Sequence, residues 1–299
     1  MTGPGMTARR LPDSRRLHLN HGPIDLVVAA WGPRDEVEAA YAQAGRAFET
    51  VLPELVGELA ALRRPMRKRG PRLRGPVARR MAAACRPYLP AFVTPMAAVA
   101  GAVADHVLAA LSAGRRLTRA YVNNGGDIAF DLRPGQALDC GIVADVTRPA
   151  VEGRVCLTHE MPVRGIASSG RAGKGQGGRS FSLGIADSVT VLAGTSAQAD
   201  VAATLIANAV DLPCHPAIER APAEALDPDS DLGQRLVTVG LGELSDDEIT
   251  EALRRGRQQA EKIRRAGLIA AAFLTLRSRC AVVGGAEALL ETHGGTREP

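Results

Sequence analysis

Apolar and polar positions follow two different spacings along this chain, so both strands and helices are expected. Alternation over residues 17–31 predicts one or two strands. Pro33 then opens a stretch rich in Glu and Ala that predicts a helix to about Leu62, which Pro53 could interrupt. A second helix is expected over residues 96–112, where many small side chains would let another backbone or a ligand come close.

The clearest local signal is a β-hairpin in the middle of the chain. Residues 120–122 and 128–130 have strand-forming side chains, and the segment Asn123–Asp127 (NNGGD) lies between them. Asparagine and glycine tolerate the positive φ angles that tight hairpin turns require. Further strands are expected over residues 138–146 and 151–157.

The second half of the chain opens with a glycine-rich stretch. We predict a loop over residues 165–178, a strand over 180–192 and a helix over 197–210. Because prolines recur over residues 213–231, this segment is interpreted as a connection.

A helix with an explicit start signal lies near the C-terminus. Ser245 and Glu248 have the spacing of a capping box, and Gly267 suits the helix end. Apolar strands are expected before this helix, at 236–239, and after it, over 268–283. Because helices and strands do not alternate in a βαβ rhythm, the predicted fold class is α+β.

These elements divide the chain into three parts. Residues 1–16 are expected to form an N-terminus without regular structure, residues 17–292 a single domain that could have two lobes, and residues 293–299 a tail. With 299 residues, of which 45% are hydrophobic, the domain can bury a substantial core.

One segment of the chain is strongly basic. Residues 59–104 contain no Asp or Glu, whereas nine basic side chains crowd residues 63–80. Such a run attracts polyanions, and the alternatives are a solvated loop, a phosphate-binding loop and a contact with nucleic acid. Because Pro and Gly interrupt the run and only 3% of the chain is aromatic, nucleic acid is disfavoured as a partner.

Cysteine usage and the N-terminus indicate the cellular compartment. The five cysteines are widely spaced without a Cys-x-x-Cys pair, which indicates reduced thiols in place of disulfides or a zinc site. The N-terminus shows neither the apolar segment of a signal peptide nor a cysteine for lipid attachment. No apolar run reaches the roughly 20 residues that span a bilayer. We therefore expect a cytoplasmic protein without a membrane partner.

Three segments together carry a resemblance to a known family. They are Val122–Asp127 (VNNGGD), Gly165–Gly170 (GIASSG), and the strand Thr190–Ala193 that leads into Gln198–Thr204 (QADVAAT). Their order and spacing resemble the hallmark segments of the ApbE-like superfamily, the relatives of magnesium-dependent FAD:protein FMN transferases. Residues 94–105 lie where that family has a characteristic helix, matched by Gly101 and Asp105, so the resemblance covers roughly residues 94–210. From Asp211 onward the chain looks like a cytosolic UPF branch of the superfamily and not like the transferases proper.

The resemblance implies an α+β fold with mixed or antiparallel sheets and helices around a central ligand cleft. It also implies that Asp200 and Thr204 hold Mg²⁺, which would bridge to the diphosphate of a dinucleotide. The spacing agrees, because positions four apart on a helix share a face, where a carboxylate and a hydroxyl suit a hard cation. Alternatively, Asp200 only stabilises the first turn of its helix while Thr204 packs inward.

The resemblance further implies a pocket for FAD or FMN. The predicted cofactor-binding residues are Asn123, Gly125, Gly126, Asp127, Ser168, Ser169, Gly170 and Thr190. Glycines let backbone amides approach a ligand, and serine hydroxyls can donate to phosphate oxygens. Ordinary turn chemistry explains the same residues without a ligand, and the catalytic residues remain unassigned.

A second glycine-rich motif gives weaker evidence for a ligand-binding loop. Residues 173–178 satisfy G-x-G-x-x-G, but a strand-like sequence follows them, whereas a dinucleotide-binding loop must open a helix. The functional interpretation is a lid carrying Arg171, Lys174 and Arg179, and the alternative is a surface loop.

Two positions depart from the transferase pattern. Ala100 stands where the transferases carry a lysine, and residues 180–187 lack the histidine and proline of their H-I-x-D-P segment. These departures put true FMN transfer to a protein threonine in doubt, although an enzyme of this type remains the favoured interpretation.

The leading hypothesis is a protein that binds a flavin nucleotide, or a similar phosphate-bearing aromatic cofactor, and carries out magnesium-dependent nucleotidyl or phosphoryl transfer. One alternative is an enzyme of pterin (methanopterin-type) one-carbon cofactor biosynthesis. Another is a non-catalytic flavin- or nucleotide-binding protein, and a nucleic-acid-binding module ranks last. The expected partner is a small phosphate-bearing cofactor, and assembly into a homo-oligomer stays open.

Overall fold

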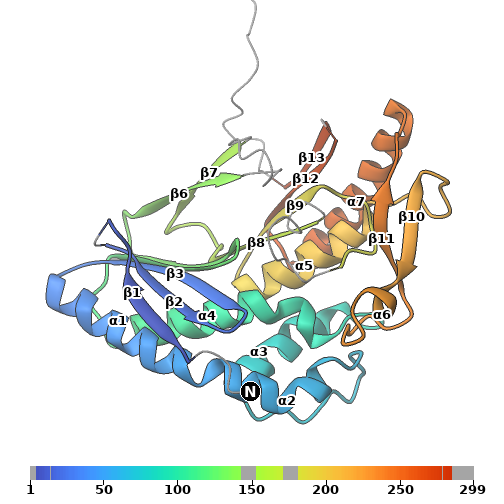
Figure 1. The fold of residues 1–299 in the computed structure, drawn as a ribbon. Coiled ribbons are helices and arrows are strands. Elements are labelled where there is room, and N and C mark those ends of the chain that lie inside the picture. The colour runs from blue at the N-terminus through green and yellow to red at the C-terminus, as the bar shows by residue number, and fades with distance from the viewer. Residues whose placement is uncertain (1–4, 14, 143–152, 171–180, 278, 285–299) are drawn as a thin grey trace, which may run out of the picture. The chain divides into compact units, whose positions relative to one another are not determined.

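The computed structural model describes residues 5–13, 15–142, 153–170, 181–277 and 279–284 (Figure 1). The described chain divides into two compact units. The first is formed by described residues within 1–136, 158–167 and 193–201, and the second by those within 137–157, 168–192 and 202–299. The chain passes from one unit to the other within strand β8 and again within helix α5.

The first unit contains an antiparallel sheet. Its strands are β1 (Thr7–Arg10), β2 (Leu17–His21), β3 (Ile24–Trp31), β4 (Arg119–Asn124), β5 (Asp127–Leu132) and β8 (Gly165–Ser169), each paired with the next. Val28 lies opposite Val122, which lies opposite Ala129, and all three are fully buried. One face of the sheet is therefore apolar and available for packing.

The helices of the first unit are α1 (Arg34–Glu49), α2 (Val51–Leu62), α3 (Pro76–Cys85), α4 (Val99–Ser112) and the short 3₁₀ helices η1 (Arg86–Tyr88) and η2 (Pro95–Ala98). Helices α1 and α4 contact the strands, and α2 and α3 pack against other helices. The long helix expected from Pro33 to Leu62 is divided at Thr50, because Pro53 is accommodated in the first turn of a new helix. The prolines expected to prevent a helix after Leu62 have the opposite effect at Pro76, which starts α3 at its first position.

The stretch Pro95–Ser112, which includes α4, is long and apolar enough to cross a membrane by length and composition alone. Half of this stretch is buried within the protein. Gly101, Ala102, Val103, Ala104 and Val107 are among its buried residues, and the helix contacts α1, β4 and β5. These contacts are those of a core helix in the first unit.

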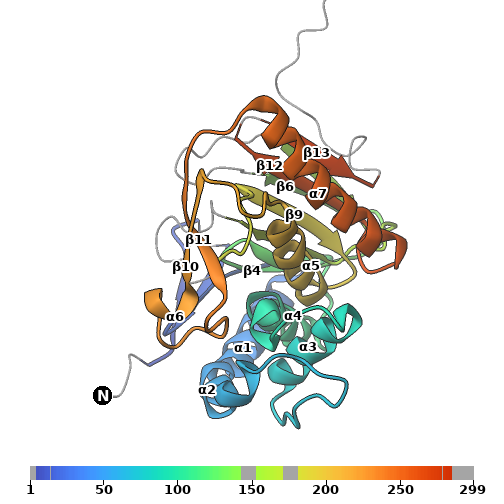
Figure 2. The same cartoon turned by 90° about the vertical axis from the view of Figure 1, so that its right-hand side faces the viewer.

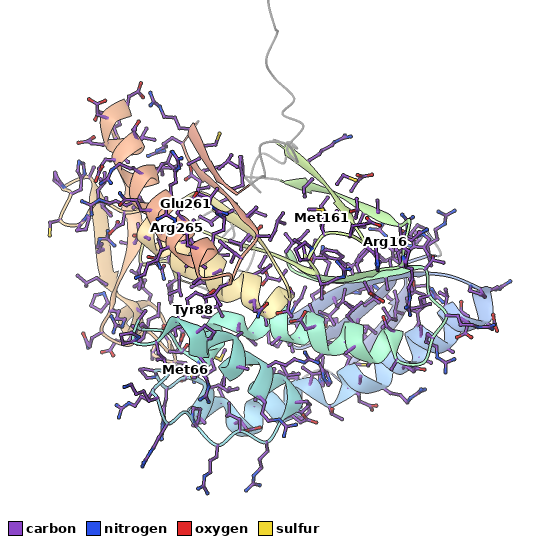
Figure 3. The ribbon with its side chains drawn as sticks, turned by 180° about the vertical axis from the view of Figure 1, so that it is seen from behind. Arg16, Met66, Tyr88, Met161, Glu261 and Arg265 are labelled. Atoms are coloured by element: carbon purple, nitrogen blue, oxygen red, sulfur yellow. The ribbon has the colours of Figure 1, made fainter. Side chains whose placement is uncertain are left out.

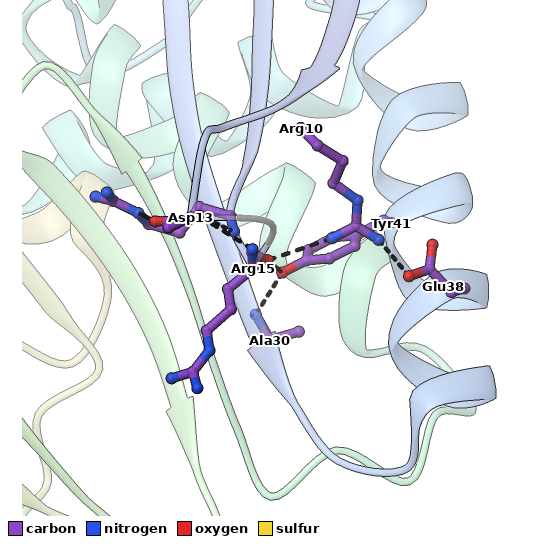
Figure 4. A network of polar contacts seen from close by, with 7 residues as sticks. Arg10, Asp13, Arg15, Ala30, Glu38 and Tyr41 are labelled. Carbon is purple, nitrogen blue, oxygen red and sulfur yellow. Dashed lines mark hydrogen bonds and ion pairs between the residues drawn. The ribbon is translucent and has the colours of Figure 1, made fainter.

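Strand β1 differs from the prediction that residues 1–16 lack regular structure. Arg10, at the end of β1, lies with its guanidinium 4.2 Å from the ring centroid of Tyr41 on α1 and forms an ion pair with Glu38 (Figure 4). The Tyr41 hydroxyl donates to the carbonyl of Arg15 at 2.6 Å and accepts from the amide of Ala30 at 3.0 Å. These tertiary contacts, which the local sequence does not reveal, fix the N-terminal strand.

The second unit contains a three-stranded sheet and two strand pairs. The sheet has the order β9 (Ser188–Ala193), β12 (Ala271–Leu276) and β13 (Arg279–Val283), all antiparallel, and α7 (Asp246–Arg265) packs on it. The pairs are β10 (Ile218–Pro222) with β11 (Leu236–Leu241) and β6 (Ala137–Ile142) with β7 (Gly153–Thr158). Helix α5 (Ser196–Ala209) agrees with the prediction, and α6 (Ala223–Leu226) follows β10.

Three expectations for the second half of the chain are wrong in detail. The predicted loop over 165–178 begins with strand β8, and the predicted strand over 180–192 begins only at Ser188. The connection predicted over 213–231 contains β10 and α6. In each case a pairing or packing partner distant in sequence overrides the local composition.

The capping box predicted at the start of α7 is confirmed. The side chain of Ser245 accepts from the amide of Glu248, and the carboxylate of Glu248 accepts from the amide of Ser245 at 2.7 Å. The helix ends at Arg265, just before Gly267 with φ 73°. Local sequence is therefore sufficient to define this element.

Ser245→Ala should lower the free energy of unfolding by about 1 kcal/mol, because one amide of the first turn loses its acceptor. Urea denaturation followed by circular dichroism measures the change. Ser245→Asp keeps an acceptor oxygen and should stay close to wild type, so equal losses in the two variants would contradict this account.

Candidate functional site

The hairpin that the sequence predicts at the NNGGD segment is confirmed, and its turn, Gly125 and Gly126, is shorter than the five-residue connection expected. Asn124 pairs with Asp127, and Gly125 and Gly126 have φ angles of 63° and 109°. The amide of Gly126 donates to Oδ1 of Asn123 at 2.8 Å, so this side-chain oxygen serves the turn itself. A Cβ atom on either glycine would meet nothing within 4 Å, which leaves the backbone of the turn open to approach.

The turn is attached to the beginning of α4. Nδ2 of Asn124 donates to the carbonyl of Ala100 at 3.1 Å. Ala100 is the position where the transferases carry a lysine, and here its backbone carbonyl holds the hairpin. The turn and the first residues of α4 are thereby kept side by side.

Helix α4 also meets the beginning of α5 at unusually short range. A Cβ atom on Gly101 would lie 2.4 Å from the carbonyl oxygen of Ser196, and one on Gly165 would lie 2.1 Å from the amide nitrogen of Ser196. No side chain fits at either position, so glycine is required where α4 at Gly101 and β8 at Gly165 approach the backbone that begins α5.

Two carboxylates join the helices at this contact. Asp105 of α4 accepts from the amides of Ser196 and Ala197, both at 3.0 Å, at the N-terminus of α5. Asp200 of α5 accepts from the amide of Gly101 at 3.0 Å, in the first turn of α4. Each helix therefore supplies the acceptor for N-terminal amides of the other, where such amides lack partners and the helix dipole favours negative charge.

Asp200 also forms a side-chain hydrogen bond with Asp127, the first residue of β5. Asp127 is buried, with 7% of its surface exposed. Burial raises the pKa of Asp200 to about 7, although hydrogen bonds from Gly101, Asp127 and Ala100 act in the opposite direction. Two carboxyl groups joined in this way share one proton, since both cannot be ionised at low energy so close together.

The shared proton bears on the Mg²⁺ prediction. Among the residues that the structure describes, no three His, Cys, Asp or Glu side chains come together in a group that could hold a metal ion. Mg²⁺ is commonly held by one or two carboxylates, with water and substrate phosphates completing its shell. The Asp127–Asp200 pair fits such a partial set of oxygen ligands, because a cation can replace the proton between the two carboxyl groups.

Thr204, the second predicted metal ligand, lies one turn after Asp200 on α5 and is half-buried. Helix α5 begins at Ser196 and has no acidic residue in its first turn. The alternative in which Asp200 only stabilises that first turn is therefore wrong, and its carboxylate stabilises α4 instead.

In the second unit, Ser168 and Thr190 lie together. Their side-chain oxygens are 2.8 Å apart in a hydrogen bond, with Ser168 exposed and Thr190 buried. Gly170 has φ 132°, and a Cβ atom there would lie 2.5 Å from the carbonyl oxygen of Asp187. Backbone packing therefore accounts for the glycine at position 170, and the hydroxyl of Ser168 is engaged with Thr190.

The predicted site residues therefore fall into two groups. Asn123, Gly125, Gly126, Asp127 and Asp200 belong to the first unit, whereas Ser168, Ser169, Gly170, Thr190 and Thr204 belong to the second. The predicted lid residues Arg171, Lys174 and Arg179 lie outside the described residues. Sequence reasoning missed the role of Asp105, although a carboxylate in an otherwise apolar helix was a signal for it.

Comparison with known proteins connects this geometry to a family. A family model described as AbpE bacteria matches residues 8–287 of the chain. A UPF0280 protein of Methanopyrus kandleri is 37% identical over 132 residues, which cover 44% of this chain and 48% of that protein. A UPF0280 protein of Methanocaldococcus jannaschii is 38% identical over 119 residues, covering 39% and 45% respectively. The matched region thus spans about half the length of these curated relatives.

A solved structure agrees with the fold. A variant of the flavin transferase ApbE of Vibrio cholerae aligns with a TM-score of 0.50 at 12% identity, covering 91% of this chain and 98% of that one. The apo form of the flavinyl transferase ApbE of Pseudomonas stutzeri aligns with a TM-score of 0.47 at 15% identity, covering 97% and 98%. The predicted α+β class, with helices and mainly antiparallel strands, is confirmed.

Gly101→Ala should lower the free energy of unfolding by about 2 kcal/mol or more, because the new methyl group must push the backbone of Ser196 away. Gly57→Ala on α2 is the matched control, since a Cβ atom there meets nothing within 4 Å. In this control the free energy of unfolding should rise by about 0.5–1 kcal/mol, because alanine restricts the unfolded chain more than glycine does. Urea denaturation tests both variants, and equal effects would refute the close-contact argument.

Stability should fall as pH rises from about 4 to about 7. The pKa of Asp200 is raised from 3.8 to about 7 on folding, so in this range the folded state binds more protons than the unfolded chain. Asp200→Asn removes this titration. Between pH 4 and pH 7 its free energy of unfolding should therefore fall less than that of the wild type, by roughly 1–3 kcal/mol. Denaturant unfolding across the pH range measures it, with Asp139→Asn, an exposed aspartate, as control. An unchanged decline in Asp200→Asn would contradict the shared-proton interpretation.

Proposed function

Since the chain belongs to the AbpE bacteria family, we propose that it binds a flavin nucleotide, or a similar phosphate-bearing aromatic cofactor, together with Mg²⁺. The observation that carries the proposal is the hydrogen-bonded pair of Asp127 and Asp200 beside the open glycine turn. The name of the structure that aligns with a TM-score of 0.50, a flavin transferase, supports the choice of a flavin.

The proposal assigns the cation to Asp200 and Asp127, with Thr204 as a further ligand on the same face of α5. Bound Mg²⁺ would neutralise a diphosphate and polarise it toward attack. Asp200 and Asp127 would give up their shared proton when the cation binds. The hydrogen bonds from the amides of Gly101 and Ala100 keep the Asp200 carboxylate in place throughout.

The glycine turn would supply the closest approach to the ligand. The backbone of Gly125 and Gly126 faces open space, so a phosphate or a ring edge can come within contact distance. This turn serves binding and orientation, and it moves no proton.

For the reaction we propose magnesium-dependent nucleotidyl or phosphoryl transfer. Two sequence features favour a second candidate, a binding protein without catalysis: Ala100 carries no cation, and residues 180–187 contain no histidine. A group that must protonate or position a leaving phosphate is therefore not evident at these positions. Binding and turnover have to be measured separately.

The binding proposal predicts that FAD and Mg²⁺ together raise the melting temperature more than the sum of their separate effects. At about 100 times the dissociation constant the ligand should add roughly 2.7 kcal/mol to stability. Asp200→Asn should lose the Mg²⁺-dependent part, because a neutral amide cannot replace the carboxylate, whereas Asp139→Asn should keep it. FAD binding that is indifferent to Mg²⁺, or absent, would overturn the proposal.

Turnover is tested on the same samples. Transfer from FAD cleaves its diphosphate, so AMP release with Mg²⁺ present indicates catalysis. Binding without AMP release, in the presence of candidate acceptors, would select the non-catalytic alternative.

A further inference from the structure

A basic surface covers the connection between α2 and α3 and the outer side of α3, all within the first unit. Its exposed cations are Arg64, Arg67, Lys68, Arg69, Arg72, Arg74, Arg79, Arg80 and Arg86. Figure 2 shows this connection as a loop on the outer side of the helices. The segment 59–104 that contains it has no Asp or Glu.

The loop that carries these cations is anchored at both ends. Met66 is buried, with 6% of its surface exposed, and its amide donates to the carbonyl of Val93 at 2.8 Å (Figure 3). At the other end, the amides of Arg74 and Gly75 donate to the carboxylate of Glu58 at 2.8 and 2.6 Å. The cations therefore project from a backbone with a defined path.

Helix α3 extends the same surface. Its buried side chains Val77, Met81 and Cys85 recur every fourth residue, so Arg79 lies on the opposite, exposed side. Arg86, the first residue of η1 directly after α3, is exposed as well. A Cβ atom on Gly70 would lie 3.7 Å from Nη2 of Arg86, which places this guanidinium beside the loop. Loop and helix thus form one continuous group of cations.

Cations outnumber acidic groups on this surface, where the carboxylate of Glu58 lies at the edge as an acceptor for backbone amides. The ion pairs found in the described part of the chain include none of its nine cations. On α7, by contrast, Arg254 and Arg255 both pair with Glu251. Like charges held close together repel, and a polyanion that binds over them relieves the repulsion.

The composition of the surface indicates which polyanion fits. All of its cations except Lys68 are arginines, whose guanidinium groups bind phosphate oxygens in pairs. Among the described residues of the first unit, Val56 on α2 is the one large apolar side chain with high exposure, which disfavours insertion into a membrane. We infer that the basic surface binds nucleic acid through its phosphate backbone, without sequence preference.

This inference revises the prediction that disfavoured nucleic acid. That prediction depended on the scarcity of aromatic residues and on the prolines and glycines in the run. Phosphate contacts require no aromatic stacking. The anchors at Met66, Arg74 and Gly75 replace the missing helix as the scaffold.

The test measures the full chain against duplex RNA and duplex DNA of about 20–30 base pairs by fluorescence anisotropy over a salt series. A loop variant combines Arg67→Ala, Lys68→Ala, Arg69→Ala and Arg72→Ala. Affinity at low salt should fall about tenfold or more, and the slope of log affinity against log salt should fall by about 0.9 for each phosphate that the variant no longer neutralises. Comparing the two duplexes shows which nucleic acid is preferred.

A charge-matched control combines Arg254→Ala, Arg255→Ala, Lys262→Ala and Arg264→Ala on α7, and it should bind like wild type. A second variant, Arg79→Gln with Arg80→Gln, removes the helical part of the surface and should also weaken binding. Circular dichroism confirms that each variant is folded. If the loop variant misfolds, the α3 variant decides.

Three results would overturn the inference. The wild type could fail to bind either duplex at low salt, or the α7 control could lose as much affinity as the loop variant. Polyglutamate or anionic vesicles could also compete as well as nucleic acid at equal charge, which would assign the surface to an acidic protein or a lipid surface. None of these results bears on flavin binding, which is measured separately.

Discussion

The first unit depends on an exchange of carboxylates between two helices. Asp105 of α4 holds the amides that begin α5, and Asp200 of α5 holds an amide in the first turn of α4. The amides of Ser196, Ala197 and Gly101 find their side-chain acceptors on the other helix, whereas the amide of Gln198 donates to the local side chain of Thr195 at 3.2 Å. Each helix therefore needs the other in register for part of its N-terminus. The exchange works only with glycine at position 101, where the two backbones nearly touch. Packing, hydrogen bonding and helix dipoles therefore impose the same arrangement.

The same exchange creates the chemistry of the candidate site. Holding α4 with Asp200 buries a second carboxylate beside that of Asp127, and burial raises the pKa of Asp200. If stability were the sole requirement, a neutral acceptor such as asparagine would hold Gly101 without the electrostatic cost. A buried carboxyl pair is thus better explained by a cation that uses it than by the fold alone, and perturbed acids of this kind gather at functional sites.

Local signals in the sequence predict the elements that depend on local physics. The Gly-Gly turn and the Ser245–Glu248 capping box are examples, because each needs only residues within a few positions. Helix α3 was not predicted, since proline was interpreted as a helix breaker where Pro76 is a starter. The role of Asp105 was not predictable in this way, because its partner Ser196 is 91 residues distant. The resemblance to a family located Asp200, but only the structure shows that its carboxylate bonds both the amide of Gly101 and the side chain of Asp127.

The candidate site buries its charged side chains, whereas the basic surface exposes them. At the site, carboxylates are buried and either hydrogen-bonded to amides or joined by a proton. At the basic surface, cations stay exposed, and residues 59–104 carry none of the chain's 32 acidic side chains. The overall charge of +5 is therefore concentrated, and the rest of the chain is net negative. A fold that only needed solubility would intersperse the two signs, as α7 does where Glu251 pairs with Arg254 and Arg255. Segregated charge on an anchored loop contributes nothing to the core, so its explanation must be sought in what the protein contacts.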